Sequence, residues 1–328
     1  MKLLMLIIAL STLLFAGCQA QFQEKSTELP ETAIGPQIPE KGYIVEELSD
    51  GLYYVSDGTY NTMFLTTGEG VIVVDAPPNL GNKIMLAIEE VTDEKITHVV
   101  YTHSHADHIG SASMYPEDAE YIAHESTKKA LENQRSTYGV FLGGGQVPVP
   151  TTTFSEEYIL EVGNQVLELK FKGANHLDGN IFVYAPKQKV VMLIDVIFPG
   201  WVPFKHFALT KDLDGFIEAH DQLLEYEFDY LVAGHLTRLG TREDVLVQQE
   251  YVVDVMNNAA NALQTVDFFA IASETGFENQ WLLFDTYLDA VARDCEEKTL
   301  EKWEDRLGGA EIFTEDHCFT ALESLRID

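Results

Sequence analysis

The chain has 328 residues, enough for one large domain or two small ones, and 46% of them are hydrophobic, so a sizeable core can form. It carries 21 basic against 53 acidic residues, a formal net charge of −32 at pH 7. Such a surface repels nucleic acid and anionic lipid headgroups, so we expect no nucleic-acid partner and interpret the acidic excess as a solubility feature.

Residues 1–17 have the pattern of a signal peptide. Lys2 gives a positive start, and the apolar run over residues 3–15 is too short to span a bilayer comfortably. The run ends in Phe15-Ala16-Gly17-Cys18, which resembles a bacterial lipobox and implies a lipidated Cys18; an ordinary cleaved signal peptide is the alternative. Gln19 in the next position favours the outer membrane by the same resemblance. We therefore expect a periplasmic lipoprotein of the bacterial cell envelope that meets the membrane through its anchor alone.

The following residues 18–41 are polar, contain Pro30, Pro36 and Pro39, and are predicted to be a flexible tether. A folded domain is expected over 42–265. Its predicted strands cover residues 45–56, 59–67, 70–75, 96–102, 119–123, 158–160, 166–171, 181–185, 190–194 and 230–233. Its predicted helices cover 82–91, 125–134, 213–225 and about 241–263, a further helix opens at 110–114, and 135–154 are expected to be loop.

The order of these elements repeats in two similar halves, which favours an α/β fold with two sheets packed face to face and helices outside. Residues 266–328 differ, because they are mostly helical with a break at Gly308-Gly309. We predict a C-terminal helical extension that either packs against the domain or covers its site.

A histidine-rich segment, residues 103–108 (HSHADH), directly follows the predicted strand 96–102. Imidazole nitrogens and carboxylate oxygens are the natural ligands of Zn²⁺. An alternating His-x-His on extended chain directs His103 and His105 to one point, whereas Asp107 and His108 point elsewhere. The segment therefore predicts two neighbouring metal sites at a rigid strand end.

At this point the chain resembles the metallo-β-lactamase superfamily, over about residues 43–263. Three later segments match that family's pattern: Gly173-Ala174-Asn175-His176, the strand 191–195 that ends in Asp195, and Gly234-His235. The resemblance implies a four-layer αββα sandwich and the branch with two metals and a bridging Asp.

The resemblance also assigns roles to the seven ligands. His103, His105 and His176 would bind the first metal, Asp107, His108 and His235 the second, and Asp195 would bridge them. The expected cofactor is two Zn²⁺, with iron or manganese left open, and a hydroxide shared by the metals would attack the substrate. Asp107 would also act as a catalytic residue that orients this nucleophile or relays its proton. Asp75, at the end of the strand 70–75, is a candidate for a residue that supports a metal ligand by hydrogen bonding, or else a plain strand-end hydrogen-bonding group.

The substrate is expected to be a small molecule with an ester or lactone bond, because true β-lactamases of the family usually carry Cys or Ser in place of Asp195. Phe198 stands where one β-lactamase branch has lysine, and near the position of the site tyrosine of the lactonases. A β-lactamase and a non-catalytic metal-binding lipoprotein remain as alternatives. The candidate pocket residues are Tyr60, Asn61, Tyr138, Phe141, Trp201 and Phe204.

Two cysteines remain beside Cys18, and an extracytoplasmic compartment permits disulfides. We predict that Cys295 pairs with Cys318, with two separate buried thiols as the alternative. The sequence sets no oligomeric state.

Overall fold

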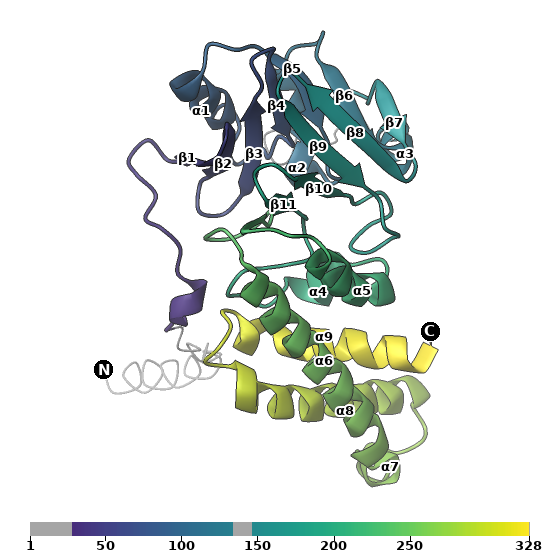
Figure 1. Cartoon of the computed structure of the whole chain (residues 1–328). Coiled ribbons are helices and arrows are strands. Elements are labelled where there is room, and N and C mark those ends of the chain that lie inside the picture. Colours follow the sequence, from purple (N-terminus) through teal and green to yellow (C-terminus); the bar gives the residue numbers. More distant parts are fainter. Residues whose placement is uncertain (1–27, 134–145, 328) are drawn as a thin grey trace, which may run out of the picture.

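The computed structural model describes residues 28–133 and 146–327. The predicted lipidation site Cys18 and the predicted pocket residues Tyr138 and Phe141 lie outside these residues. Within them, two sheets stack at the top of the molecule, and a layer of long helices lies below (Figure 1).

The first sheet has seven strands in the order β1 to β7. They are β1 (Ile44–Ser49), β2 (Leu52–Ser56), β3 (Asn61–Thr66), β4 (Val71–Val74), β5 (Ile96–Val100), β6 (Glu120–His124) and β7 (Thr152–Phe154). The pairs from β1 to β4 are antiparallel, and those from β4 to β7 are parallel. The parallel strands are joined through α1 (Lys83–Val91), α2 (Ala106–Ile109) with the short turn η2 (Ala112–Met114), and α3 (Glu125–Glu132).

The second sheet has five strands in the order β12-β11-β10-β9-β8. They are β8 (Glu157–Val162), β9 (Gln165–Lys170), β10 (Phe182–Ala185), β11 (Val190–Met192) and β12 (Tyr230–Val232). All neighbours are antiparallel except β11 and β12. The helices α4 (Lys205–Leu209) and α5 (Leu213–Leu224) follow β11 along the chain.

Three apolar cores follow from the alternation of side chains along the strands. One lies between the two sheets and includes Met63 and Val183; a second packs α1 on the outer face of the first sheet; the third packs helices on the outer face of the second sheet. The predicted αββα sandwich is confirmed.

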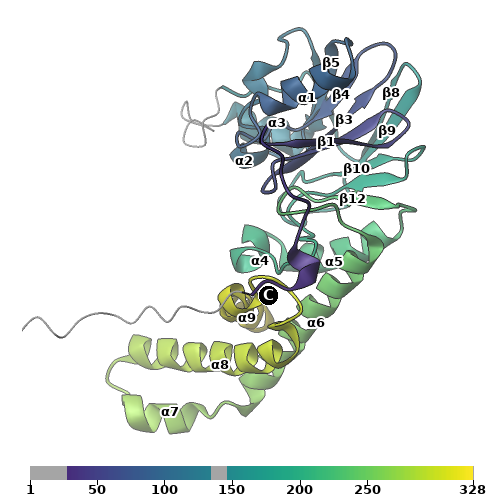
Figure 2. The same cartoon turned by 90° about the vertical axis from the view of Figure 1, so that its left-hand side faces the viewer.

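The predicted helical extension is also present (Figure 2). It consists of α7 (Phe268–Thr275), α8 (Gln280–Trp303) and α9 (Ala310–Ile327), which pack with α6 (Arg242–Thr265). Cys295 in α8 and Cys318 in α9 are fully buried and form a disulfide, as predicted. None of the helices among the described residues combines the length and apolar composition needed to cross a bilayer.

Three local expectations differ from the structure. The predicted strand 45–56 is two strands, because Asp50 and Gly51 take left-handed φ angles of 41° and 81° and turn the chain. Residues 152–154, expected to be loop, form β7.

The third difference concerns the predicted tether, whose described part is docked on the protein. Ala33, in the short turn η1 (Glu31–Ala33), is fully buried. Its carbonyl oxygen accepts hydrogen bonds from Trp201 Nε1 at 3.0 Å and Thr237 Oγ1 at 2.7 Å. A flexible tether is therefore wrong for this stretch, whose carbonyls find specific donors.

Candidate metal centre

The histidine-rich segment begins three residues after the end of β5 and turns at His105, the N-cap residue of α2, which has an extended backbone (φ −72°, ψ 138°). The extended chain before α2 sends His103 and His105 to one side. The helical turn after it carries Asp107 and His108 to the other. The predicted split of the segment into two ligand sets is therefore what the backbone produces.

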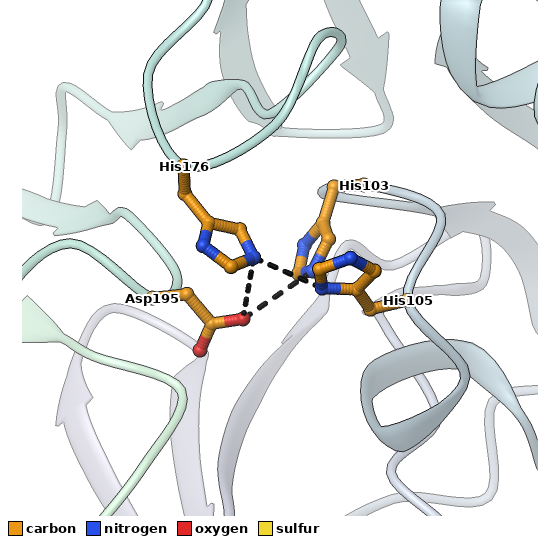
Figure 3. Close-up of side chains that lie close together, drawn as sticks. All are labelled: His103, His105, His176 and Asp195. Carbon is orange, nitrogen blue, oxygen red and sulfur yellow. Dashed lines mark hydrogen bonds and ion pairs between the residues drawn. The ribbon is translucent and has the colours of Figure 1, made fainter. Parts of the chain in front are cut away.

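The first set comprises His103, His105, His176 and Asp195 (Figure 3). His176 Nε2 lies 2.9 Å from His105 Nδ1 and 3.3 Å from Asp195 Oδ2. His103 Nε2 lies 3.4 Å from the same carboxylate oxygen. Three imidazole nitrogens and one carboxylate oxygen thus converge on one point.

The second set comprises Asp107, His108 and His235. Nε2 of His108 and Nε2 of His235 are 3.0 Å apart, and they lie 3.4 and 3.5 Å from Asp107 Oδ2. Asp195 reaches this set too, with Oδ2 at 3.1 Å from His108 and Oδ1 at 3.0 Å from His235. The carboxylate of Asp195 therefore lies between the two sets, where the sequence places the bridge.

Burial sets the protonation of the first set. It lowers the pKa of His103 well below its usual value, lowers that of His105, and lowers that of His176 to about 4. Burial also disfavours ionised Asp195, but the surrounding histidines, His108 above all, outweigh it and hold its pKa well below the usual range. Neutral imidazoles around an ionised carboxylate are the protonation states in which these groups bind metal.

The second set behaves differently without a metal ion. Burial alone would lower the pKa of His108, but the carboxylates of Asp195 and Asp107 outweigh it and raise the pKa to about 9. The two carboxylates thus draw a positive charge onto the nearest imidazole. A metal cation at this point would supply the same charge and leave His108 neutral.

Unpaired polar atoms fit a metal at this place. His103 Nε2 and Asp195 Oδ1 are buried and make no hydrogen bond of good geometry within the described residues, although they lie 3.4 Å from Asp195 Oδ2 and 3.0 Å from His235 Nε2, respectively. A buried polar atom without a well-aligned hydrogen bond costs about 1–3 kcal/mol, and a metal ion between these groups would satisfy both atoms. The donor set of five imidazoles and two carboxylates fits Zn²⁺. This donor set is the one observation that bears on the identity of the metal.

Asp75 acts on the first set through Thr102. Its carboxylate accepts hydrogen bonds from Thr102 N at 2.8 Å and from Thr102 Oγ1 at 2.6 Å. The hydroxyl has one proton, given to Asp75, so its contact of 3.1 Å with His103 Nδ1 must be an acceptance. The proton of His103 therefore sits on Nδ1, and Nε2 is left free to bind a metal.

The strand ends that carry the ligands also hold unusual backbone. Asp75 and Asp195 have left-handed φ angles of 58° and 61°, which Asp tolerates better than most residues.

Gly234 precedes the last histidine because there is no room for a side chain; a Cβ there would lie 2.7 Å from both His108 Cε1 and Ile194 Cγ2. Asn180 ties two ligand loops together, donating to Asn175 Oδ1 and Ile194 O at 2.9 Å each.

A cavity of about 420 Å³ opens beside the ligands. Three of the predicted pocket residues, Tyr60, Trp201 and Phe204, line it, and Tyr60 Oη donates to Asp107 Oδ2 at 3.3 Å. The cavity is otherwise lined by His105, Asp107, His176, Asp195, Phe198, Val202, Ala208, Leu209, His235, Leu236 and Phe313.

Asn61 does not line the cavity, which corrects its prediction as a pocket residue. It is buried, and its side-chain amide donates to Ala233 O and Leu236 O at 2.9 Å each. It therefore positions the loop that carries His235.

The sequence interpretation missed Phe198, Leu209 and Phe313 as lining residues. Of these, Phe198 was noted in the sequence only because it stands where related enzymes have a lysine or, nearby, a tyrosine. Phe313 lies in α9, so the helical extension both packs against the sandwich and contributes to the cavity.

Comparisons with known proteins agree with this geometry. The family model of the metallo-β-lactamase superfamily matches residues 55–235. The chain is 27% identical over 208 residues to the 2,4-dinitroanisole O-demethylase subunit alpha of Nocardioides sp. (strain JS1661), covering 62% of this chain and 61% of that protein. It is 29% identical over 133 residues to a metallo-beta-lactamase type 2 of Bacillus sp. (strain 170), covering 40% of this chain and 48% of that protein. The chain thus spans about half to three fifths of the length of these relatives.

A solved structure extends the likeness of fold. A double mutant of the sec-alkyl sulfatase PisA1 superposes with a TM-score of 0.58 at 15% identity, covering 87% of this chain and 50% of that one. Since residues 1–235 make up less than three quarters of the chain, this likeness must include helices that follow the segment matched by the family model. The likeness of fold to this sulfatase therefore continues beyond β12.

Proposed function

The chain belongs to the metallo-β-lactamase superfamily, and we propose that it is a metal-dependent hydrolase that cleaves neutral esters or lactones with two zinc ions. The observation that carries the proposal is Asp195, whose two carboxylate oxygens lie 3.1 and 3.0 Å from ligand nitrogens of the second set, while Oδ2 also meets the first set. A closed structural zinc site would need four ligands around one ion. Six ligands around the shared carboxylate of Asp195, open to a cavity, support a two-metal site.

When bound, zinc ions polarise a carbonyl oxygen and bring the pKa of water near neutrality. The protein's own residues would hold these ions and orient the reacting groups. His103, His105 and His176 would hold the first ion, Asp107, His108 and His235 the second, and Asp195 would contact both.

Asp107 is the residue that can move a proton. Its carboxylate lines the cavity and accepts a hydrogen bond from the hydroxyl of Tyr60, which fixes its orientation. Burial, aided by Asp107, raises the pKa of Tyr60 above its usual value, so the phenol keeps its proton and remains a donor at neutral pH. Asp107 would take the proton of the attacking water and pass it to the leaving oxygen.

The lining of the cavity supports a neutral substrate. Among its described residues there is neither Lys nor Arg, and apart from the candidate metal ligands its lining is aromatic and aliphatic. A β-lactam carries a carboxylate, for which such a wall offers no ionic partner. Because one of the relatives is a metallo-beta-lactamase type 2, hydrolysis of β-lactams is the alternative activity that has to be tested.

We also propose that the protein acts outside the cytoplasm as a lipid-anchored protein of the bacterial cell envelope, in the outer membrane. The lipobox-like segment before Cys18 supports this location. The disulfide between Cys295 and Cys318 supports it independently, because disulfides persist in oxidising compartments. Labelling of cells with a radioactive fatty acid, with Cys18→Ala as the control, tests the anchor; a label retained in that variant would reject it.

One assay panel tests the function. Nitrocefin, an acyl-homoserine lactone and p-nitrophenyl esters are offered to the zinc-loaded protein, with a chelator as control. We expect ester or lactone turnover that the chelator abolishes, and two zinc ions per chain. Nitrocefin turnover without ester or lactone turnover would replace the proposal with a β-lactamase, and one zinc or none per chain would refute the two-metal site.

The variant His105→Ala should lose activity yet keep its fold, because His105 is only partly buried. The matched control is His98→Ala in β5, whose nearest charged partner is Glu120 and which lies outside the cavity. Retained activity in His105→Ala would reject the assignment of the site.

A further inference from the structure

The element α4 (Lys205–Leu209), between β11 and α5, is not a regular right-handed helix but a left-handed turn built from residues other than glycine. His206, Phe207, Ala208 and Leu209 have φ angles of 51°, 48°, 60° and 61°. Left-handed backbone costs an L-residue free energy through the clash of its Cβ with a carbonyl, and such residues normally occur singly. Four in a row persist only where tertiary contacts determine the conformation.

Helix α9 supplies those contacts. Asp316 Oδ1 accepts the backbone N–H of His206 at 2.5 Å, and Thr320 Oγ1 lies 3.0 Å from His206 Nδ1. His317 Nε2 donates to Phe204 O at 3.1 Å, while its ring stacks on Phe207 with centroids 4.5 Å apart.

These contacts come from one face of α9. The spacing of Phe313, Asp316, His317 and Thr320 is i, i+3, i+4 and i+7, so the four side chains share a stripe of the helix. Tyr251 of α6 holds His317 in place, since the tyrosine hydroxyl lies 2.7 Å from His317 Nδ1. The buried imidazole is thus neutral, with one nitrogen accepting and the other donating.

The turn and the helix together form the apolar wall of the cavity. Ala208 and Leu209 line it from the turn, and Phe313 lines it from α9, in edge-to-face contact with Phe204 at 5.3 Å between ring centroids. The candidate metal ligands His105, Asp107, His176, Asp195 and His235 line the same cavity. A molecule bound in the cavity can therefore contact both the reacting groups and this wall.

We propose that α9 is the specificity element of this site. Phe313 and the left-handed turn bind the apolar alkyl or aryl group of the substrate, and Asp316 and His317 are positioning residues that hold the turn. This inference rests on the proposed ester or lactone hydrolysis and names the substrate class: neutral esters or lactones with a medium-length apolar group.

The size of the cavity bounds that group. At ~30 Å³ for each water-sized unit, 420 Å³ holds roughly fourteen non-hydrogen atoms, some of them at the reacting centre. We expect the preference to peak at acyl chains of about six to eight carbons. Up to that length each added methylene should raise kcat/KM about fourfold, the factor that follows from burying one methylene.

The first test measures kcat/KM for p-nitrophenyl esters from acetate to decanoate. In Phe313→Ala the ratio of kcat/KM for the octanoate to kcat/KM for the acetate should fall about tenfold. Phe319→Ala is the matched control that should keep the wild-type ratio, because Phe319 is on the same helix, is exposed, and does not line the cavity. Asp316→Ala should raise KM for the octanoate more than KM for the acetate, a difference between substrates that a general loss of folding would not produce.

The second test needs no turnover. Chelator-treated protein is titrated with p-nitrophenyl octyl ether, and quenching of tryptophan fluorescence reports binding next to Trp201. Phe313→Ala should bind about tenfold more weakly than the wild type, and Phe319→Ala as tightly. Equal binding by wild type and Phe313→Ala would overturn the inference, whether or not esters are cleaved. Normal binding behaviour with no ester or lactone turnover would instead refute the proposed reaction.

Discussion

Replacing Thr102 by valine should weaken the first metal site without touching any ligand. Thr102 is fully buried, and its hydroxyl accepts from His103 Nδ1 at 3.1 Å and donates to Asp75 Oδ2 at 2.6 Å. Valine keeps the branched shape, so packing changes little. The buried N–H of His103 loses its acceptor, however, and the tautomer that exposes Nε2 to the metal loses its support.

The magnitude follows from these two lost contacts. Groups that orient a metal-binding histidine are worth 10- to 100-fold in metal affinity, so the first zinc should bind ~1.4–2.8 kcal/mol more weakly. The unpaired N–H should also cost the metal-free fold about 1–3 kcal/mol. The second zinc, held by the other set, should keep its affinity.

Competition with a chromophoric chelator of known zinc affinity measures both steps. Thr299→Val is the control: Thr299 is equally buried, and its hydroxyl donates to Cys295 O at 2.8 Å in α8, so stability should fall while both zinc affinities remain. Two zinc ions bound to Thr102→Val with wild-type affinity would refute the orienting role of this hydroxyl.

Three further predictions concern stability. Burial lowers the pKa of His317 to about 4, so as the pH falls below ~6.5 the unfolded chain takes up a proton at this histidine before the folded protein does. Between pH 7 and pH 5 the unfolding free energy of the wild type, measured by urea titration, should therefore fall ~2 kcal/mol more than that of His317→Gln. Equal losses in the two proteins would contradict this. The cross-link between Cys295 and Cys318, 23 residues apart, should contribute roughly 3 kcal/mol, so a double alanine variant whose thermal midpoint is unchanged would refute that contribution. Ala208→Gly should leave the thermal midpoint equal or higher because glycine relieves the left-handed strain, whereas Ala259→Gly in α6 should lower it; equal losses in both would argue against strain at Ala208.

Residues 103–108 and Asp195 could be predicted as candidate ligands because they follow strands that the sequence marks clearly. Strands such as 70–75 and 96–102 are apolar runs that end abruptly in polar residues, and parallel strands deliver their ends to one edge of a sheet. The split of the ligands into two sets followed from local geometry as well, since extended chain before His105 and a helical turn after it need only nearest neighbours. The roles of His176 and His235 came from the family pattern, because nothing local marks either one.

The apolar wall could not be predicted, because no local signal describes it. Residues 205–209 contain no glycine or asparagine to indicate left-handed backbone. The conformation depends on Asp316, which lies 110 residues further along the chain from His206. Phe313 is one apolar residue of a helix like any other until α9 is docked. The prediction of Asn61 as a pocket residue was wrong for the same reason, because its hydrogen-bond partners Ala233 and Leu236 come within reach only when the two sheets pack together.

This difference explains why the reaction was easier to infer than the substrate. The candidate metal ligands lie on segments that follow strands of the sandwich, where short-range rules determine much of the geometry. The group that would recognise a substrate rests on a strained turn and on a helix that lies beyond the segment matched by the family model. A change in α9 can therefore alter the apolar wall of the cavity while Asp195 and the histidines stay in place. It follows that relatives which share all seven ligands but differ in the helices after β12 should be expected to share chemistry without sharing substrates.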